Sequence, residues 1–147
     1  MKIILQPTTT AEWYELIRES QHHIGLFFDD HVESYLILTL DKFIKEEIHN
    51  ETPIAIEFLS SISMENSHAN QKLRKIGDRC LILAGLFPEH AEKVNVSTTY
   101  FIDMGQQAYL TLADRARIKT DPKLFYKLGF QFIDIKSVLN TMRSLSS

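Results

Sequence analysis

The chain lacks several features that would assign it to a familiar class of protein. Its 147 residues include a single cysteine, so no disulfide can form within one chain. No apolar run approaches the ~18 residues that a membrane-spanning helix needs, so no membrane partner is expected. The apolar start of the chain, residues 1–7, is too short for the core of a signal peptide, which predicts a cytoplasmic location.

Positive charge and catalytic motifs are also scarce. Sixteen Lys and Arg face nineteen Asp and Glu, and a net charge of −3 argues against a nucleic-acid partner. The sequence has no glycine-rich phosphate loop, no Gly-x-Ser-x-Gly elbow and no Cys-x-x-Cys pair. These absences favour a protein without catalytic residues, cofactor or metal, and they leave enzymatic activity undecided.

What the sequence does contain is helical periodicity. Apolar residues recur at steps of three and four, while five glycines and four prolines lie mostly near apparent element ends. This pattern predicts one all-α domain over residues 1–147, a bundle of about six helices with short connections. Residues 1–8 are expected to be extended and residues 144–147 to fray. The expected helices span 10–23, 30–49, 53–63, 69–85, 98–117 and about 122–143, with one further short turn after Pro88.

Several residues predict where these helices end and begin. Gly25 is expected to end the first helix in a left-handed conformation. Asp29 or Asp30 then caps the second helix, because a carboxylate accepts from free amides at the helix start. Gly85, followed by Pro88 three residues later, is expected to end the helix that begins at 69.

Two glycines within helices indicate close helix crossings. Gly77 and Gly105 lie on apolar helix faces, where a glycine costs about 1 kcal/mol relative to alanine unless another group packs against it. The sequence leaves open whether these faces meet within one chain or between two chains. Cys80 lies in the same apolar run, which predicts a buried and unreactive thiol.

The candidate ligand-binding residues lie along the same two helices. Asp78 is adjacent to a buried face, and a carboxylate in that position has to be hydrogen-bonded or exposed. Tyr100 or Tyr109 could supply the hydrogen bond, which would make the group purely structural. The alternative is a small-ligand site lined by Asp78, Arg79, Tyr100 and Tyr109.

Other polar residues suggest metal or anion binding only weakly. Glu46/His49 and Glu65/His68 match the Glu-x-x-His spacing of di-iron bundles, but they fall at a helix end and in an expected loop. A second cluster has metal-ligand side chains without ligand spacing: His22, His23, Asp29, Asp30 and His31. No metal is therefore expected.

A basic stretch offers a second type of site. Lys72, Lys75 and Arg79 share one side of a helix, where they could hold a phosphate or an acidic partner. A solvated outer helix face explains the same pattern.

The segment from residue 73 to 113 carries a distinctive pattern. It reads Gly77-Asp78-Arg79-Cys80-Leu81, Ala84-Gly85-Leu86-Phe87-Pro88-Glu89, Tyr100-Phe101 and Gly105-Gln106-Gln107-Ala108-Tyr109. This pattern resembles an uncharacterised bacterial family of all-helical proteins, and residues 35–43 look like an earlier helix of that family. The resemblance implies a bacterial cytosolic protein and transfers no activity.

These observations favour a non-enzymatic interaction or regulatory module that forms a homodimer and binds a protein partner. The expected dimer surfaces are surplus apolar residues on the helix at 30–49 and a near-heptad seam at 125–142, which could instead close the bundle. The alternative is a helical bundle that binds a small ligand or metal, with or without enzymatic activity.

Overall fold

The computed structural model describes residues 10–45, 54–64, 66–115 and 122–146. This part of the chain contains eight helices and no strand, so the all-α prediction is confirmed while the helix count exceeds the six or so expected. The helices are α1 (Thr10–Ile24), α2 (Asp30–Lys45), α3 (Ile54–Ile62), α4 (Ser67–Leu86), α5 (Glu89–Lys93), α6 (Thr98–Arg115), α7 (Pro122–Phe130) and α8 (Phe132–Ser146).

The two additional helices have different origins. α5 is the five-residue turn that follows Pro88, where a short turn was expected. The last predicted helix is instead interrupted at Gln131, which separates α7 from α8. The Gln131 amide donates to the Lys127 carbonyl at 2.8 Å, and the Ile135 amide donates to the Gln131 carbonyl at 2.9 Å. The chain therefore bends at Gln131 while these helical hydrogen bonds persist on both sides.

The apolar seam of α7 and α8 packs inward and closes the bundle. Its six members are at most 1% exposed: Phe125, Leu128, Phe132, Ile135, Leu139 and Met142. The seam is therefore not available as a dimer surface, which was its other interpretation. Two apolar residues, Ile37 and Leu38, lie off the main apolar face of α2. Ile37 is buried and Leu38 is exposed, so α2 presents less exposed apolar surface than expected.

Several helix boundaries differ from those predicted. α4 begins at Ser67 rather than 69, because the side chain of Asn66 accepts a hydrogen bond from the Ala69 amide at 2.9 Å. α8 continues to Ser146, into the segment expected to fray. The expected extended segment at 1–8, the end of the helix at 46–49 and its Glu46/His49 pair lie outside the described residues.

Gly85 does not end α4 as predicted. It lies within the helix, which continues to Leu86, and a Cβ atom at this position would stand 2.6 Å from the Cβ of Leu139. The glycine therefore provides space for α8. Gly25, by contrast, ends α1 with a positive φ of 72°, as expected.

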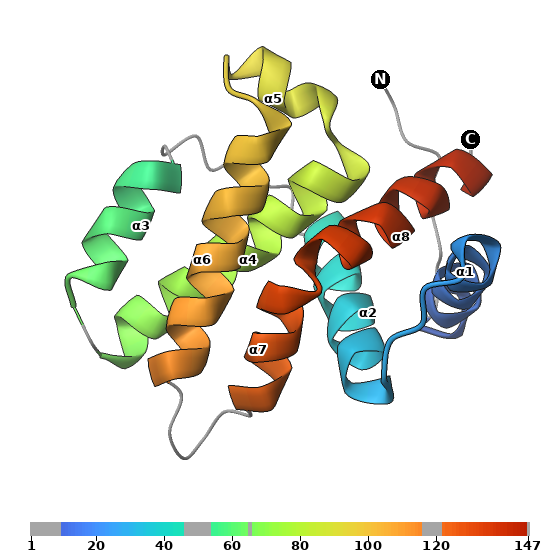
Figure 1. The fold of residues 1–147 in the computed structure, drawn as a ribbon, viewed down its shortest axis with the longest axis horizontal. Helices are drawn as coiled ribbons and strands as arrows, with labels where there is room; N and C mark the ends of the chain where they lie inside the picture. Colours follow the sequence, from blue (N-terminus) through green and yellow to red (C-terminus); the bar gives the residue numbers. More distant parts are fainter. Residues whose placement is uncertain (1–9, 46–53, 65, 116–121, 147) are drawn as a thin grey trace.

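The centre of the molecule is the crossing of α4 and α6, which is visible in Figure 1. A Cβ atom on Gly77 would meet the ring of Tyr109 at 2.6 Å, and one on Gly105 would meet Phe132 at 2.4 Å and Cys80 at 2.9 Å. Both glycines thus mark crossings within one chain. The second half of α4, from Cys80 to Leu86, is buried on every side, as an all-apolar helix segment requires.

Two arginines donate hydrogen bonds to carbonyls at the C-terminal ends of helices that precede them in the chain. Arg115, the last residue of α6, donates to the carbonyls of Ser61, Ile62 and Met64 at 2.9, 2.7 and 2.9 Å. Arg143 of α8 donates to the Leu86 carbonyl at 2.7 Å. Carbonyls in the last turn of a helix have no partner within it, so both side chains act as caps from outside the helix.

The length and polarity of the helices also bear on membrane insertion. Within the described ranges, none of them is both long enough and apolar enough to cross a bilayer.

Candidate functional site

A polar cluster lies at the crossing of α4 with its neighbours. One oxygen of Asp78, Oδ1, accepts hydrogen bonds from the Tyr35 hydroxyl at 2.6 Å and the Tyr109 hydroxyl at 2.7 Å. The Nε of Arg74 donates to the Tyr35 oxygen at 3.1 Å, and its guanidinium lies 5.1 Å from the centre of the Tyr35 ring. We call these four residues the Asp78 cluster.

Local packing explains why the Asp78 cluster forms. Gly77 leaves room for the Tyr109 ring to lie against α4, which places the Tyr109 hydroxyl beside the next residue, Asp78. Phe125 of α7 packs edge-on against Tyr35, with ring centres 5.9 Å apart, and lies tilted against Tyr109, with ring centres 6.3 Å apart. Aromatic packing thus fixes both phenols while their hydroxyl groups point to the carboxylate.

Burial sets the electrostatics of this cluster. It raises the pKa of the Asp78 carboxyl above the ordinary value, although both tyrosine hydrogen bonds and the charge of Arg74 act in the opposite direction. Burial and the neighbouring carboxylate also raise the pKa of Tyr35 and Tyr109. Both phenols therefore stay protonated and act as hydrogen-bond donors, which suits a structural link between helices better than proton transfer.

The four residues expected to form a ligand site are divided by the structure. Asp78 and Tyr109 meet in the cluster, so Tyr109 is the donor that the sequence left open. Tyr100 lies nine residues earlier on α6, which is about 13 Å along the helix axis, and packs edge-on against Phe101. Arg79 lies on another side of α4 and lines a separate pocket.

Two members of the Asp78 cluster, Tyr35 and Arg74, were not predicted. The signal for Tyr35 was present, because a tyrosine on the apolar face of a helix needs a partner for its hydroxyl. Sequence spacing gives no indication of which helix provides that partner.

The pocket beside Arg79 has a volume of about 210 Å³ and lies between α3 and α4. We call it the α4 pocket. Its described lining consists of Glu57 from α3 and, from α4, His68, Gln71, Lys72, Lys75, Ile76 and Arg79. The three cations that the sequence placed on one side of a helix therefore do line a common space.

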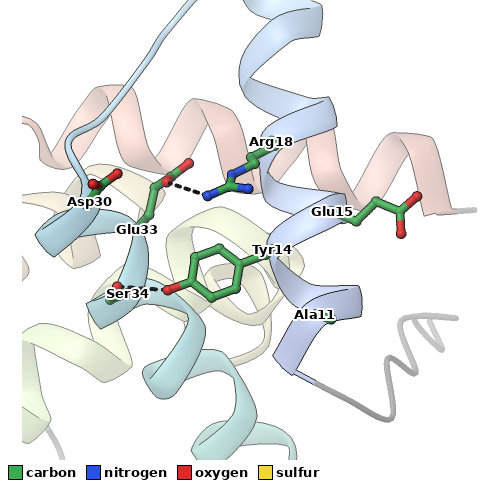
Figure 2. A pocket seen from close by; sticks show the side chains of 7 residues that line it. All are labelled: Ala11, Tyr14, Glu15, Arg18, Asp30, Glu33 and Ser34. Carbon is green, nitrogen blue, oxygen red and sulfur yellow. Dashed lines mark hydrogen bonds and ion pairs between the residues drawn. The ribbon is translucent and has the colours of Figure 1, made fainter.

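A larger, open groove of about 720 Å³ lies between α1 and α2 (Figure 2). Its polar side chains pair across the two helices: the hydroxyls of Tyr14 and Ser34 are 2.8 Å apart, and Arg18 lies 3.8 Å from Glu33. Gln21 also donates to the buried Glu33 at 2.6 Å. These contacts dock α1 on α2, while Glu15 points away from the other side chains in the view.

Two further predictions concern reactive and metal-binding groups. Cys80 is buried, as predicted, and burial raises the pKa of its thiol to about 12, which favours the unreactive thiol form. Asp29 caps α2 as expected, because its Oδ1 accepts from the Val32 amide at 2.9 Å. Among the residues that the structure describes, no group of three or more His, Cys, Asp or Glu is placed to hold a metal ion.

No protein-family model, curated protein or solved structure matches this chain. The similarity of residues 73–113 to a bacterial family therefore remains a prediction.

Proposed function

We propose that this protein is a non-enzymatic interaction module that forms a homodimer through the outer face of α3. A cytoplasmic bacterial protein of this kind fits the pattern in residues 73–113. The support comes from α3 itself, whose sequence IAIEFLSSI contains six apolar residues and a single charged one, Glu57. A helix with apolar residues on more than one side is normally covered on more than one side.

The two faces of α3 differ in how they are covered. Phe58 and Ser61 point into the bundle and are 8% and 1% exposed, whereas Ile56 and Leu59 are 60% and 64% exposed. Ser60 and Ser63 are exposed as well, and their small side chains would let a second helix approach closely. The outer face of α3 thus carries exposed apolar side chains beside small ones, and among the described residues no other element packs on it.

The size of this face predicts a weak dimer. α3 is about 13 Å long, and a standard stable interface buries about 800 Å² on each partner, which so short a helix cannot supply alone. Ile62 and Met64 extend the exposed apolar surface at its C-terminal end. We therefore expect a dissociation constant in the micromolar range, with α3 paired against its copy around a two-fold axis.

Light scattering coupled to size-exclusion chromatography tests the proposal. We expect the wild-type protein to change from dimer to monomer on dilution and Leu59→Glu to be monomeric throughout, because a carboxylate would be buried unpaired. Phe130→Glu is the matched control, since Phe130 is 74% exposed but lies at the end of α7. A wild-type protein that stays monomeric at high concentration, or a Phe130→Glu variant that alone becomes monomeric, would refute the role of α3.

A further inference from the structure

The α4 pocket combines a geometric and an electrostatic pattern that the self-association of α3 does not use. His68, Lys72, Lys75 and Arg79 follow one another at steps of four, three and four, which places them in one row along a helix. All four line the same pocket. A single row of basic residues that also borders a cavity differs from basic residues scattered over a solvated face.

The charge within this pocket is unbalanced. Its described lining carries the cations Lys72, Lys75 and Arg79 and one carboxylate, Glu57, and of these Arg79 and Glu57 already have partners within the chain. In the described part of the chain, the recorded ion pairs involve Arg18, Lys127 and Arg143, so neither Lys72 nor Lys75 has a carboxylate within bonding distance. The two ammonium groups are therefore available to an anion from outside the chain.

The position of the pocket on α4 adds to this field. His68 lies in the first turn of the helix, where the helix dipole leaves partial positive charge. An anion between His68 and Lys72 would thus be attracted by the helix end as well as by the side chains.

We propose that the α4 pocket binds the phosphate group of a small phosphate monoester. The neighbouring ammonium groups of Lys72 and Lys75 favour a compact dianion, to which they donate short, charge-assisted hydrogen bonds. The volume of about 210 Å³ is smaller than a typical drug-sized pocket and corresponds to roughly seven water molecules. It can hold a phosphate with a short substituent.

The remaining lining residues restrict that substituent. The negative charge of Glu57 would repel a second anionic group, and Gln71 offers polar contacts to a hydroxyl. Ile76, which is 1% exposed, provides an apolar wall. A hydroxylated monophosphate therefore fits this pocket better than a diphosphate or a dicarboxylate.

Isothermal titration calorimetry at low salt tests the site, with glycerol 3-phosphate, inorganic phosphate and glycerol as probes. We expect saturable binding of glycerol 3-phosphate, weaker binding of phosphate and none of glycerol. The double variant Lys72→Met/Lys75→Met should weaken binding about tenfold, which corresponds to two lost ion pairs of moderate strength. Glu57→Gln should strengthen it, because a like charge is removed.

The matched control is Lys123→Met/Lys136→Met, which removes the same charge from α7 and α8 and should change the affinity less than twofold. Leu59→Glu should bind glycerol 3-phosphate like the wild type, because Leu59 does not line the α4 pocket. The proposed phosphate site and the proposed dimer can therefore be refuted independently. Absence of saturable binding up to roughly 10 mM ligand would overturn the proposal. So would equal weakening by both double variants, or binding of a phosphoserine peptide without binding of glycerol 3-phosphate.

Discussion

The part of α4 that precedes Cys80 carries polar side chains on two sides, and the two groups have different surroundings. On one side, Asp78 accepts two hydrogen bonds from tyrosines of α2 and α6. On the other side, Lys72 and Lys75 line the α4 pocket. Neither lysine forms an ion pair with another described residue. Adjacent residues of one helix, Asp78 and Arg79, thus belong to sites of different character.

The Asp78 cluster therefore stabilises the fold, whereas Lys72 and Lys75 are open to a ligand. A buried carboxylate destabilises a protein unless donors surround it, so the Asp78 cluster has to be complete within the chain. Exposed ammonium groups are solvated and impose no such requirement. Substitutions on the Asp78 side should therefore change stability, whereas those on the pocket side should change binding.

The largest expected effect comes from Gly77→Ala. The added Cβ would stand 2.6 Å from the Tyr109 ring, so the ring has to move and its hydrogen bond to Asp78 is weakened. Overpacking together with a strained charged hydrogen bond should lower the free energy of unfolding by about 3 kcal/mol, despite the higher helix propensity of alanine. Urea denaturation measures this, and Gln71→Ala on the exposed side should stay within about 0.5 kcal/mol. A stabilised Gly77→Ala protein would mean that Tyr109 does not pack there.

The next effect is that of Tyr109→Phe. Removing the hydroxyl takes one donor from the Asp78 carboxylate without creating a cavity, and a hydrogen bond to a charged group contributes about 2 kcal/mol. Tyr14→Phe is the control, because its hydroxyl bonds only the neutral Ser34 and should cost about 1 kcal/mol or less. Equal costs for the two substitutions would argue that Asp78 does not depend on Tyr109.

A third test uses pH to compare wild type with Asp78→Asn. Because burial raises the Asp78 pKa above its ordinary value of 3.8, the protonated carboxyl stabilises the fold below that value, and this contribution is lost as pH rises through the folded pKa. The unfolding free energy of Asp78→Asn minus that of the wild type should thus increase with pH in this window and then level off. All other carboxylates cancel in the difference. A difference that decreases with pH would show that the ionised form is the favoured one in the fold.

The smallest effect on stability is expected for Lys72→Met/Lys75→Met. Neither lysine has a recorded ion pair in the described chain, so the unfolding free energy in phosphate-free buffer should change by less than about 0.5 kcal/mol. Adding phosphate should raise the melting temperature of the wild type more than that of this variant, since a ligand stabilises the state that binds it in proportion to its affinity and concentration. A large loss of stability without phosphate would place the lysines among the groups that hold the fold.

Sequence patterns predicted the parts of this molecule that depend on local chemistry. The Asp29 cap, the left-handed Gly25 and the buried Cys80 each follow from a residue type in its immediate context. Tyr109 was one of two candidate donors to Asp78, because both lay on the helix expected to cross nearby.

Features that depend on how helices meet were missed. The partner Tyr35 lies 43 residues before Asp78, and sequence periodicity defines helix faces without fixing their relative register. Gly85 matched an end signal, yet its role is to admit Leu139. The bend at Gln131 was hidden because the apolar spacing continues across it.

The cap supplied by Arg115 has a consequence for when the proposed dimer could assemble. α3 has nine residues, fewer than the ~12–15 an isolated helix needs, and its last turn is closed by a side chain more than 50 positions later in the chain. The outer face of α3 therefore takes shape only after α6 has been synthesised and has docked. A nascent or partly folded chain would not present it, so self-association would select for finished molecules.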